Sequence, residues 1–282
     1  MSQVPDYEIV KPEEETPPRM PQRSVGLWIV AALLVAGAAV AVYLVFSRQT
    51  IAPANVAPDK VDSTPRTQPL GGAAASVVVP PLEQSDGVVR DLVKTLSSHP
   101  SVLSWLATEG LIRNFALGVS NVADGKTAAG QLRTLRPTGK FVVIDRGGEV
   151  RIDPKSYVRY DALAAAAASL DPAGSAKIYA TLKPRIEEAY RELGPSKATF
   201  DQVLEEAIVK LLRTPILNDP VRVEPHGIGY GYAAADVEAL TPAQKQLLRF
   251  GPRNVRLIKA SLRQIALALG IPASRLPAAD SL

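Results

Sequence analysis

The residues best suited to chemistry form a short cluster of two phenols, a guanidinium and a carboxylate: Tyr157, Tyr160, Arg159 and Asp161. Such groups, held close together, can bind a carboxylate or a sugar through charge-assisted hydrogen bonds. The same groups can instead satisfy one another in a network that locks a hairpin to the following helix. Of the two interpretations, we favour the structural one.

A glycine-rich run at residues 227–232 is the second candidate for a ligand site. It follows a possible short strand at 221–224, but it lacks the GxGxxG spacing and the long helix that a nucleotide site requires. A plain flexible turn is therefore the favoured interpretation. The two tyrosines of the run, Tyr230 and Tyr232, lie close to His226 in the sequence and could form a ligand-stacking surface with it.

The strongest charge pattern of the C-terminal half is a basic stripe with intervals of four, three, three and four residues: Arg249, Arg253, Arg256, Lys259 and Arg263. Apolar residues in the same segment predict a buried helical stripe: Val255, Ile258, Leu262, Ile265 and Leu269. The basic face could meet anionic lipid, a polyanionic polymer or nucleic acid. A solvated basic face is the simpler interpretation. Aromatic residues do not interleave with the stripe, so single-strand stacking is not indicated.

Catalytic motifs with a strong signature are missing from the sequence. There is no HExxH, GxSxG, Walker loop or Ser-x-x-Lys motif, no cysteine, and only two histidines, His99 and His226. Two pairs of adjacent carboxylates occur: Glu187 with Glu188, and Glu205 with Glu206. Neighbours on one helix cannot face each other across a cleft, as glycoside hydrolysis requires. We therefore predict no catalytic residue, no cofactor and no metal site.

The helices that carry these residues are marked by a capping residue followed by proline: Asp153-Pro154, Asp171-Pro172, Thr241-Pro242 and Gly251-Pro252. Proline fits the first helical position because its missing N–H has no helical partner there. The pairs predict helices over roughly 154–169, 172–193, 242–249 and 252–269, and apolar spacing adds one over roughly 199–213. Pro184 should kink or split the second of these.

Three further helices are expected before them, over residues 86–97, 101–108 and 111–123, the first capped by Ser85. The β-branched runs 141–145 and 149–153 flank Gly147 and Gly148, which predicts a short hairpin. The alanine-rich stretch 162–168 predicts a buried central helix. The expected fold is mainly α, with an N-terminal transmembrane helix followed by a globular domain of about eight helices and one small β-hairpin.

The transmembrane prediction rests on residues 25–46, from Val25 to Phe46, which include no charged residue. As a helix this run is about 33 Å long, enough to cross a hydrocarbon core of about 30 Å. Trp28 and Tyr43 lie near its two ends, as interfacial aromatic residues do. The long acidic segment before it argues against a cleaved signal peptide, so we expect an uncleaved anchor in the lipid bilayer.

The predicted layout is a disordered tail (1–24), the transmembrane helix (25–46), a Pro/Ala/Ser-rich linker (47–80), a mainly helical domain (81–272) and a flexible C-terminal tail (273–282). Lys and Arg are equally frequent on the two sides of the helix, but Arg19 and Arg23 lie close together before it. Positive charge favours the cytoplasmic side, so we expect the tail inside and the domain in the periplasm.

Several strings resemble a bacterial family catalogued as domain of unknown function 3014: PPLEQSD at 80–86, RIDPKSYVRYD at 151–161, LKPRIEEAYRELG at 182–194 and LTPAQKQLLRFGPRNVR at 240–256. The resemblance covers most of residues 80–270 in the same order. It implies a bacterial protein with one span in the inner membrane. It implies no activity, and no catalytic residue can be transferred from it.

The sequence therefore favours a non-catalytic binding or scaffold module of the cell envelope, whose partner is an envelope protein or the cell wall. An alternative is an envelope enzyme acting on cell-wall material. This alternative would be favoured by a cleft that joins residues 157–161 to the loop of Tyr230 and contains a carboxylate of raised pKa. Another is a cytoplasm-facing basic domain that binds nucleic acid or anionic lipid, with nucleic acid the less favoured partner. The oligomeric state stays open.

Overall fold

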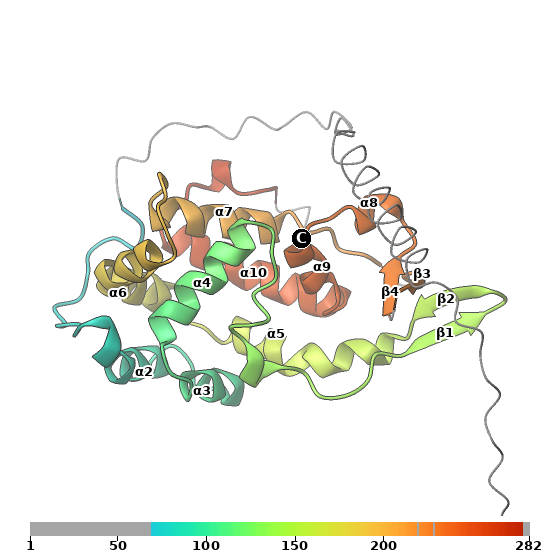
Figure 1. Cartoon of the computed structure of the whole chain (residues 1–282), viewed down its shortest axis with the longest axis horizontal. Coiled ribbons are helices and arrows are strands. Elements are labelled where there is room, and N and C mark those ends of the chain that lie inside the picture. The colour runs from blue at the N-terminus through green and yellow to red at the C-terminus, as the bar shows by residue number, and fades with distance from the viewer. Residues whose placement is uncertain (1–68, 219, 228, 279–282) are drawn as a thin grey trace, which may run out of the picture. The chain divides into compact units, whose positions relative to one another are not determined.

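The computed structural model describes residues 69–218, 220–227 and 229–278 (Figure 1). Contacts divide the chain into two units, Met1–Asp59 and Lys60–Leu282, and all described residues belong to the second. The predicted tail, the transmembrane helix at residues 25–46 and most of the linker lie outside the described residues. Within the described residues, no helix combines the length and the apolar character needed to cross a bilayer.

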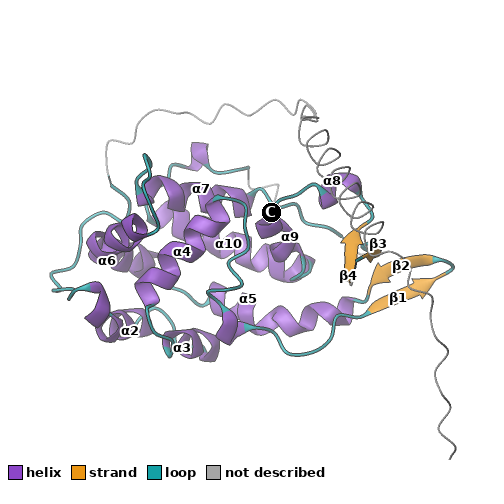
Figure 2. Cartoon of the chain, viewed as in Figure 1, coloured by secondary structure: helices purple, strands orange, loops and turns teal. Residues whose placement is uncertain are grey.

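The described domain is mainly helical, as predicted (Figure 2). It contains nine α-helices: α2 Asp86–Lys94, α3 Pro100–Leu106, α4 Leu111–Ala123, α5 Asp161–Ala168, α6 Pro172–Glu192, α7 Phe200–Leu212, α8 Ala235–Glu238, α9 Pro242–Leu248 and α10 Pro252–Ala268. Four short 3-10 helices join them: η1 Leu82–Gln84, η2 Arg133–Leu135, η3 Pro154–Tyr160 and η4 Ala273–Arg275.

The helix starts predicted from capping residues before proline are confirmed at α6, α9 and α10. Asp171 accepts hydrogen bonds from the N–H groups of the first turn of α6, and Thr241 forms a capping box with Gln244 at α9. At Asp153 the outcome differs, because the cap opens the 3-10 helix η3 and α5 begins only at Asp161. The single helix predicted over 154–169 is therefore two elements.

Helix α6 runs without interruption through Pro184, so of the two predicted effects, a kink or a split, the split is wrong. The proline removes one bond of the helical ladder, because it has no N–H to donate to the carbonyl four residues earlier. Buried residues on both sides of it, Leu182 before and Ile186 after, fix the helix to the core. Tertiary packing thus offsets the local cost of the proline.

The strands form two antiparallel hairpins, β1 Val143–Arg146 with β2 Glu149–Ile152, and β3 Val223–His226 with β4 Gly229–Tyr232. The first is the predicted hairpin, and its turn residues have the positive φ angles that a two-residue turn needs, 67° at Gly147 and 85° at Gly148. The second hairpin was not predicted, because the glycine-rich run is strand β4 and not a flexible turn. A bridge between Arg151 and Arg222 joins β2 to β3.

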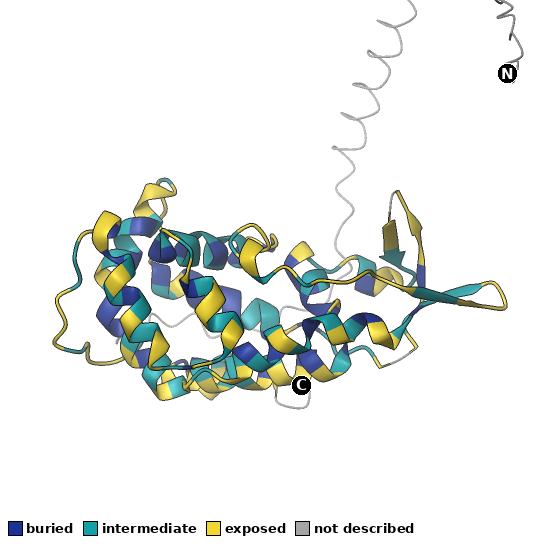
Figure 3. Ribbon diagram, turned by 90° about the horizontal axis from the view of Figure 1, so that it is seen from below, coloured by how far each residue is buried: buried dark blue, intermediate teal, exposed yellow. Residues whose placement is uncertain are grey.

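The main core lies between α4, α6, α7 and α10 (Figure 3). Phe200, at the start of α7, is fully buried, and its ring lies 5.8 Å from Phe115, 6.4 Å from Tyr179 and 5.5 Å from Tyr190. The alanine-rich helix α5 packs on α10, and its residues Ala164 and Ala166 are buried. Both hairpins lie outside this core.

Residues 69–81, which we call the strap, are packed onto the domain although most of them fall in the predicted linker. Leu70 is 1% exposed and belongs to the core. The strap is held by backbone donors at three points: Leu70 N to Asp201 Oδ2 (3.1 Å), Gly71 N to Leu269 O (3.0 Å) and Ala75 N to Thr181 Oγ1 (3.0 Å). Part of the predicted C-terminal tail is packed as well, because Leu276 is buried.

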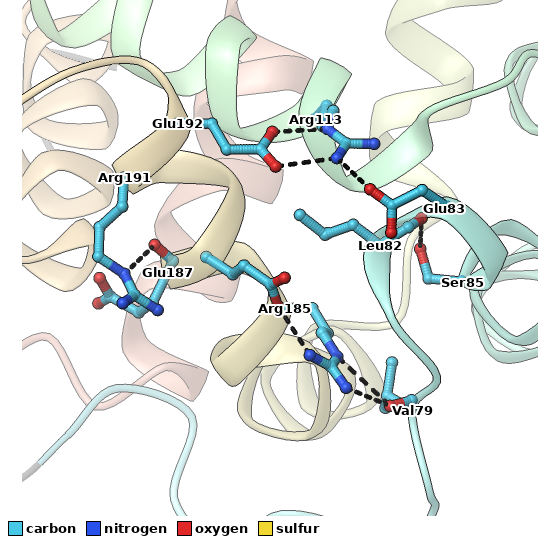
Figure 4. A network of polar contacts seen from close by, with 10 residues as sticks. Val79, Leu82, Glu83, Ser85, Arg113, Arg185, Glu187, Arg191 and Glu192 are labelled. Atoms are coloured by element: carbon cyan, nitrogen blue, oxygen red, sulfur yellow. Dashed lines mark hydrogen bonds and ion pairs between the residues drawn. The ribbon is translucent and has the colours of Figure 1, made fainter.

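Two arginines join the strap and η1 to the helices (Figure 4). Arg185 of α6 donates to the carbonyl of Val79 at 3.4 and 3.2 Å. Arg113 of α4 forms ion pairs with Glu83 of η1 at 2.8 Å and with Glu192 of α6 at 2.6 Å. The hydrogen bonds from Arg113 lower the pKa of both carboxyl groups. The N-terminal approach to the domain is therefore an ordered part of it.

Candidate functional site

The two ligand-site candidates of the sequence are neighbours in the fold, and Phe141 joins them. The ring of Phe141, just before β1, lies 5.9 Å from the ring of Tyr230 on β4. The guanidinium carbon of Arg159, on η3, lies 5.7 Å from the centroid of the same Phe141 ring. Phe141 was expected only as part of a hairpin, so the contact that unites the site was missed.

The contacts continue from Arg159 into the domain. Its guanidinium carbon also lies 4.9 Å from the ring centroid of Tyr160, and Tyr160 stacks on Phe250 with centroids 4.3 Å apart. We call Tyr230, Phe141, Arg159, Tyr160 and Phe250 the aromatic–arginine stack. It connects strand β4, the approach to β1, helix η3 and the turn between α9 and α10.

Local hydrogen bonds fix the segment of Phe141 against η3. The N–H of Val142 donates to Ser156 Oγ at 2.8 Å, and the N–H of Asp153 donates to the carbonyl of Val142 at 3.0 Å. The Asp153 side chain then caps η3 by accepting from the N–H of Lys155 at 2.9 Å. The start of η3 and the start of β1 are thus held together as one unit.

The outer end of the stack is an exposed apolar surface. Phe141 is 39% exposed, Tyr230 44%, Val142 45% and Val158 63%. Large apolar side chains gathered on a surface are typical of contact sites for other molecules. We call Phe141 and the two residues that contact its ring, Arg159 and Tyr230, the aromatic surface.

The other two residues of the predicted cluster face elsewhere. Asp161 accepts a hydrogen bond from Asn254 Nδ2 at 2.7 Å and pairs with Arg253 at 3.6 Å, so it ties α5 to α10. Tyr157 packs against Gly251, where an added Cβ would lie 2.3 Å from its Cγ. The cluster is therefore divided, with Asp161 in the structural role that the sequence favoured.

Tyr157 and Tyr232 line a recess between η3, the hairpins and α10, which also touches Ile152, Leu248 and Val255. The recess is too narrow to admit a water molecule. The Tyr232 hydroxyl is buried without a hydrogen-bond partner among the described residues, and burial raises its pKa to about 12. This hydroxyl therefore stays protonated at physiological pH.

The carboxylate beside this recess belongs to Glu238 of α8. It accepts hydrogen bonds from Lys245 Nζ at 2.5 Å and from the N–H of Tyr232 at 2.8 Å, and these lower its pKa. An enzyme at this place would be favoured by a carboxylate whose pKa is raised. The pKa of Glu238 is instead lowered.

His226 does not join the tyrosines. Residues alternate between the faces of a strand, and the register pairs His226 with Gly229 and Pro225 with Tyr230. A Cβ added at Gly231 would meet Glu238 and His226, which places this histidine on the face opposite Tyr230. The proposed stacking surface therefore contains Tyr230 and Phe141 in place of His226.

The predicted basic face of α10 is not continuous, because Lys259 is fully buried. Its Nζ donates to the carbonyl of Thr214 at 2.7 Å, and burial lowers its pKa. A signal for this was present in the sequence, since Val255, Lys259 and Leu262 follow the spacing of a single buried stripe.

The other basic residues of that stripe contact the protein itself: Arg249 binds Gln246 Oε1 (3.0 Å), Arg253 pairs with Asp161 (3.6 Å), Arg256 binds Asn218 Oδ1 (3.1 Å) and Arg263 binds the carbonyl of Pro277 (2.5 Å). In the described residues, no group of His, Asp or Glu could hold a metal ion.

A family described as "Protein of unknown function (DUF3014)" matches residues 111–266, more than half of the chain. The chain belongs to this family. The match confirms the family that the strings indicated, and it includes the strings at 151–161, 182–194 and 240–256 but not the one at 80–86. Comparisons of the DUF3014 chain with curated proteins and with solved structures found no match.

The DUF3014 match includes every residue of the aromatic–arginine stack, from Phe141 to Phe250. The strap, α2, α3 and η4 lie outside it. The candidate site is therefore part of the segment that defines DUF3014 membership, whereas the N-terminal and C-terminal packing segments are not.

Proposed function

We propose that this DUF3014 protein is a non-catalytic binding module of the bacterial cell envelope, anchored in the inner membrane with its domain in the periplasm. The observation that carries the proposal is the aromatic surface. Interface centres are enriched in aromatic residues and arginine, and truncating such residues costs the most binding energy. Phe141, Tyr230 and Arg159 together provide that composition on one exposed surface.

The membrane part of the proposal rests on the sequence. The uncharged run at residues 25–46 has the length of a transmembrane helix, and Arg19 with Arg23 before it favours a cytoplasmic N-terminus. A reporter active only in the periplasm and a reporter fluorescent only in the cytoplasm, each fused after Leu282, test this arrangement. We expect activity from the periplasmic fusion alone, and fluorescence alone would overturn the orientation.

The binding part is tested by photo-crosslinking in intact cells. A photo-reactive amino acid replaces Val142, next to Phe141 in the chain, and a matched control replaces Leu193 at the end of α6, because both residues are 45% exposed. We expect a discrete crosslinked product from position 142 that is lost when Phe141 is changed to Ala. The same pattern of products from both positions would contradict a binding role for this surface.

A further inference from the structure

The guanidinium of Arg159 has no hydrogen-bond or ion-pair partner among the described residues. Its Nε is buried, and the contacts of the group are with the rings of Phe141 and Tyr160. Arginine carries five N–H donors in a planar fork that never loses its charge. A charged donor without a protein acceptor is ready to bind an acceptor from another molecule. Because Nε is buried, the Nη groups of Arg159 are the donors that such a molecule can reach.

The carboxylates nearest to Arg159 in the sequence do not supply that acceptor. Asp153 is occupied by the N–H of Lys155 at the cap of η3. Asp161 is occupied by Asn254 and Arg253 on the side of α10. The rings meanwhile hold the guanidinium in place, which reduces the conformational entropy that it loses on binding.

The surroundings of Arg159 indicate what kind of acceptor fits. The exposed rings of Phe141 and Tyr230, 5.9 Å apart, provide apolar surface next to the guanidinium, which favours a ligand with an apolar group beside its anionic group. A polyphosphate chain would instead need a row of free cations. The basic stripe of α10 does not provide one, since Lys259 is buried and Arg263 binds a backbone carbonyl.

We propose that the aromatic surface binds an acidic peptide segment of a partner protein. A carboxylate of the segment accepts two hydrogen bonds from the Nη groups of Arg159, and an adjacent apolar side chain of the segment packs on Phe141 and Tyr230. This inference rests on the binding role proposed above, and it adds the chemical class of the partner and the residue that selects it.

The test uses the full-length chain in lipid nanodiscs and an array of short synthetic peptides, read by fluorescence. Each peptide carries Glu beside Leu or Phe, and it is matched by copies in which Gln or phosphoserine replaces Glu. We expect the Glu peptides to bind best. Replacing Glu by Gln should weaken binding by about 10- to 100-fold, because a charge-assisted hydrogen bond is lost.

The variants separate the inference from the proposed function. R159Q should remove the preference for Glu over Gln, and R159K should reduce it, because an ammonium cannot form the bidentate pair. R191Q, on the exposed side of α6, is the charge-matched control and should bind like the wild type. Thermal unfolding of each variant shows whether it is folded. If R159Q does not fold, R159K serves as the test.

Each outcome supports or overturns the inference. The inference is overturned if R159Q still prefers Glu peptides over Gln peptides. It is also overturned if the wild type prefers phosphoserine peptides, or if it binds no Glu peptide. If the crosslink from position 142 still depends on Phe141 in those cases, the binding module remains and only the acidic class of the partner is wrong. If that crosslink is also absent, both proposals fail.

Discussion

Asp201 joins the strap, α6 and α7 through one carboxylate. It accepts from Leu70 N at 3.1 Å, Tyr179 Oη at 2.6 Å and Lys183 Nζ at 2.5 Å. Burial opposes the ionised form, but these hydrogen bonds outweigh it and lower the pKa of the group. Three segments of the core therefore depend on a single ionised side chain.

We predict that Asp201→Asn destabilises the fold by about 1.5–3 kcal/mol at neutral pH, because the three donors that face a charged acceptor lose its charge. A lowered folded-state pKa gives stability that is present above the unfolded value of about 3.9 and is lost as pH falls below it. Urea unfolding of both proteins from neutral pH to pH 3 measures this. The difference between them should shrink below about pH 4, and a constant difference would contradict the role of the ionised carboxylate.

Tyr179 and Tyr232 allow a comparison of the free energy of unfolding with and without a hydrogen-bonded phenol hydroxyl. Tyr179 donates to Asp201, whereas the buried hydroxyl of Tyr232 has no partner among the described residues. We predict that Tyr179→Phe lowers the free energy of unfolding by about 1–3 kcal/mol, while Tyr232→Phe changes it by less than about 0.5 kcal/mol or raises it. Chemical denaturation of both variants is the measurement, and equal losses would show that the Tyr232 hydroxyl is satisfied.

At the scale of elements, the contact of η3 with α10 depends on Gly251. This residue has φ of 80°, and a Cβ there would lie 2.3 Å from Tyr157 Cγ. Gly270 at the other end of α10 has φ of 87° but no atom within 4 Å of an added Cβ. Both glycines have a positive φ, but ψ of 161° places Gly251 in a region that is essentially restricted to glycine. The space around the two residues differs as well.

We predict that Gly251→Ala destabilises the domain more than Gly270→Ala, by about 1–3 kcal/mol. The excess arises because the ring of Tyr157 must leave the recess, and because the backbone of Gly251 lies in a region that is essentially restricted to glycine. Thermal unfolding of both variants gives the comparison. If the two losses were equal, the close packing of η3 on α10 would not contribute to stability.

For the whole molecule, the family match and the folding unit differ in extent. The match begins at residue 111 and ends at residue 266. The core also includes residues outside this range: Leu70, Leu82, Val89, Leu106, Leu269, Ile271 and Leu276. Their removal would expose the apolar faces of α4, α6 and α10, at about 1.5–3 kcal/mol for each large side chain. Net stabilities of domains are only about 5–15 kcal/mol.

We therefore predict that a fragment of residues 111–266 shows no cooperative thermal transition, whereas a fragment of residues 69–278 does. Circular dichroism and calorimetry of the two fragments distinguish them. A cooperative transition in the shorter fragment would mean that the strap and the C-terminal segment only cover the domain and do not complete its core.

Much of this architecture could be predicted from the sequence because its signals are local. A capping residue before proline fixes a helix start within a few residues, and α4 begins and ends where its apolar spacing predicts. Strand β4 was missed because its glycines have low strand propensity, and only pairing with β3 makes it a strand. The strap was missed because proline and alanine predict a linker wherever no partner is known.

The candidate site was predicted only in part, for a geometrical reason. Tyr157 to Asp161 are adjacent in the sequence, but a helical segment turns successive side chains in different directions. Tyr157 lines the recess, Arg159 faces Phe141, and Asp161 faces α10. Contacts such as Phe141 with Tyr230 join residues far apart in the chain, and no local pattern predicts them.

The strap also gives the domain a mechanical property. A pull on the chain from the N-terminal side would reach the core directly at Leu70, because the strap is bonded to α6, to α7 and to the end of α10. The bonds at Asp201, Leu269 and Thr181 lie close together along the strap, so they would share the load. The domain would resist tension at this point more strongly than a fold whose tether joins a loose loop.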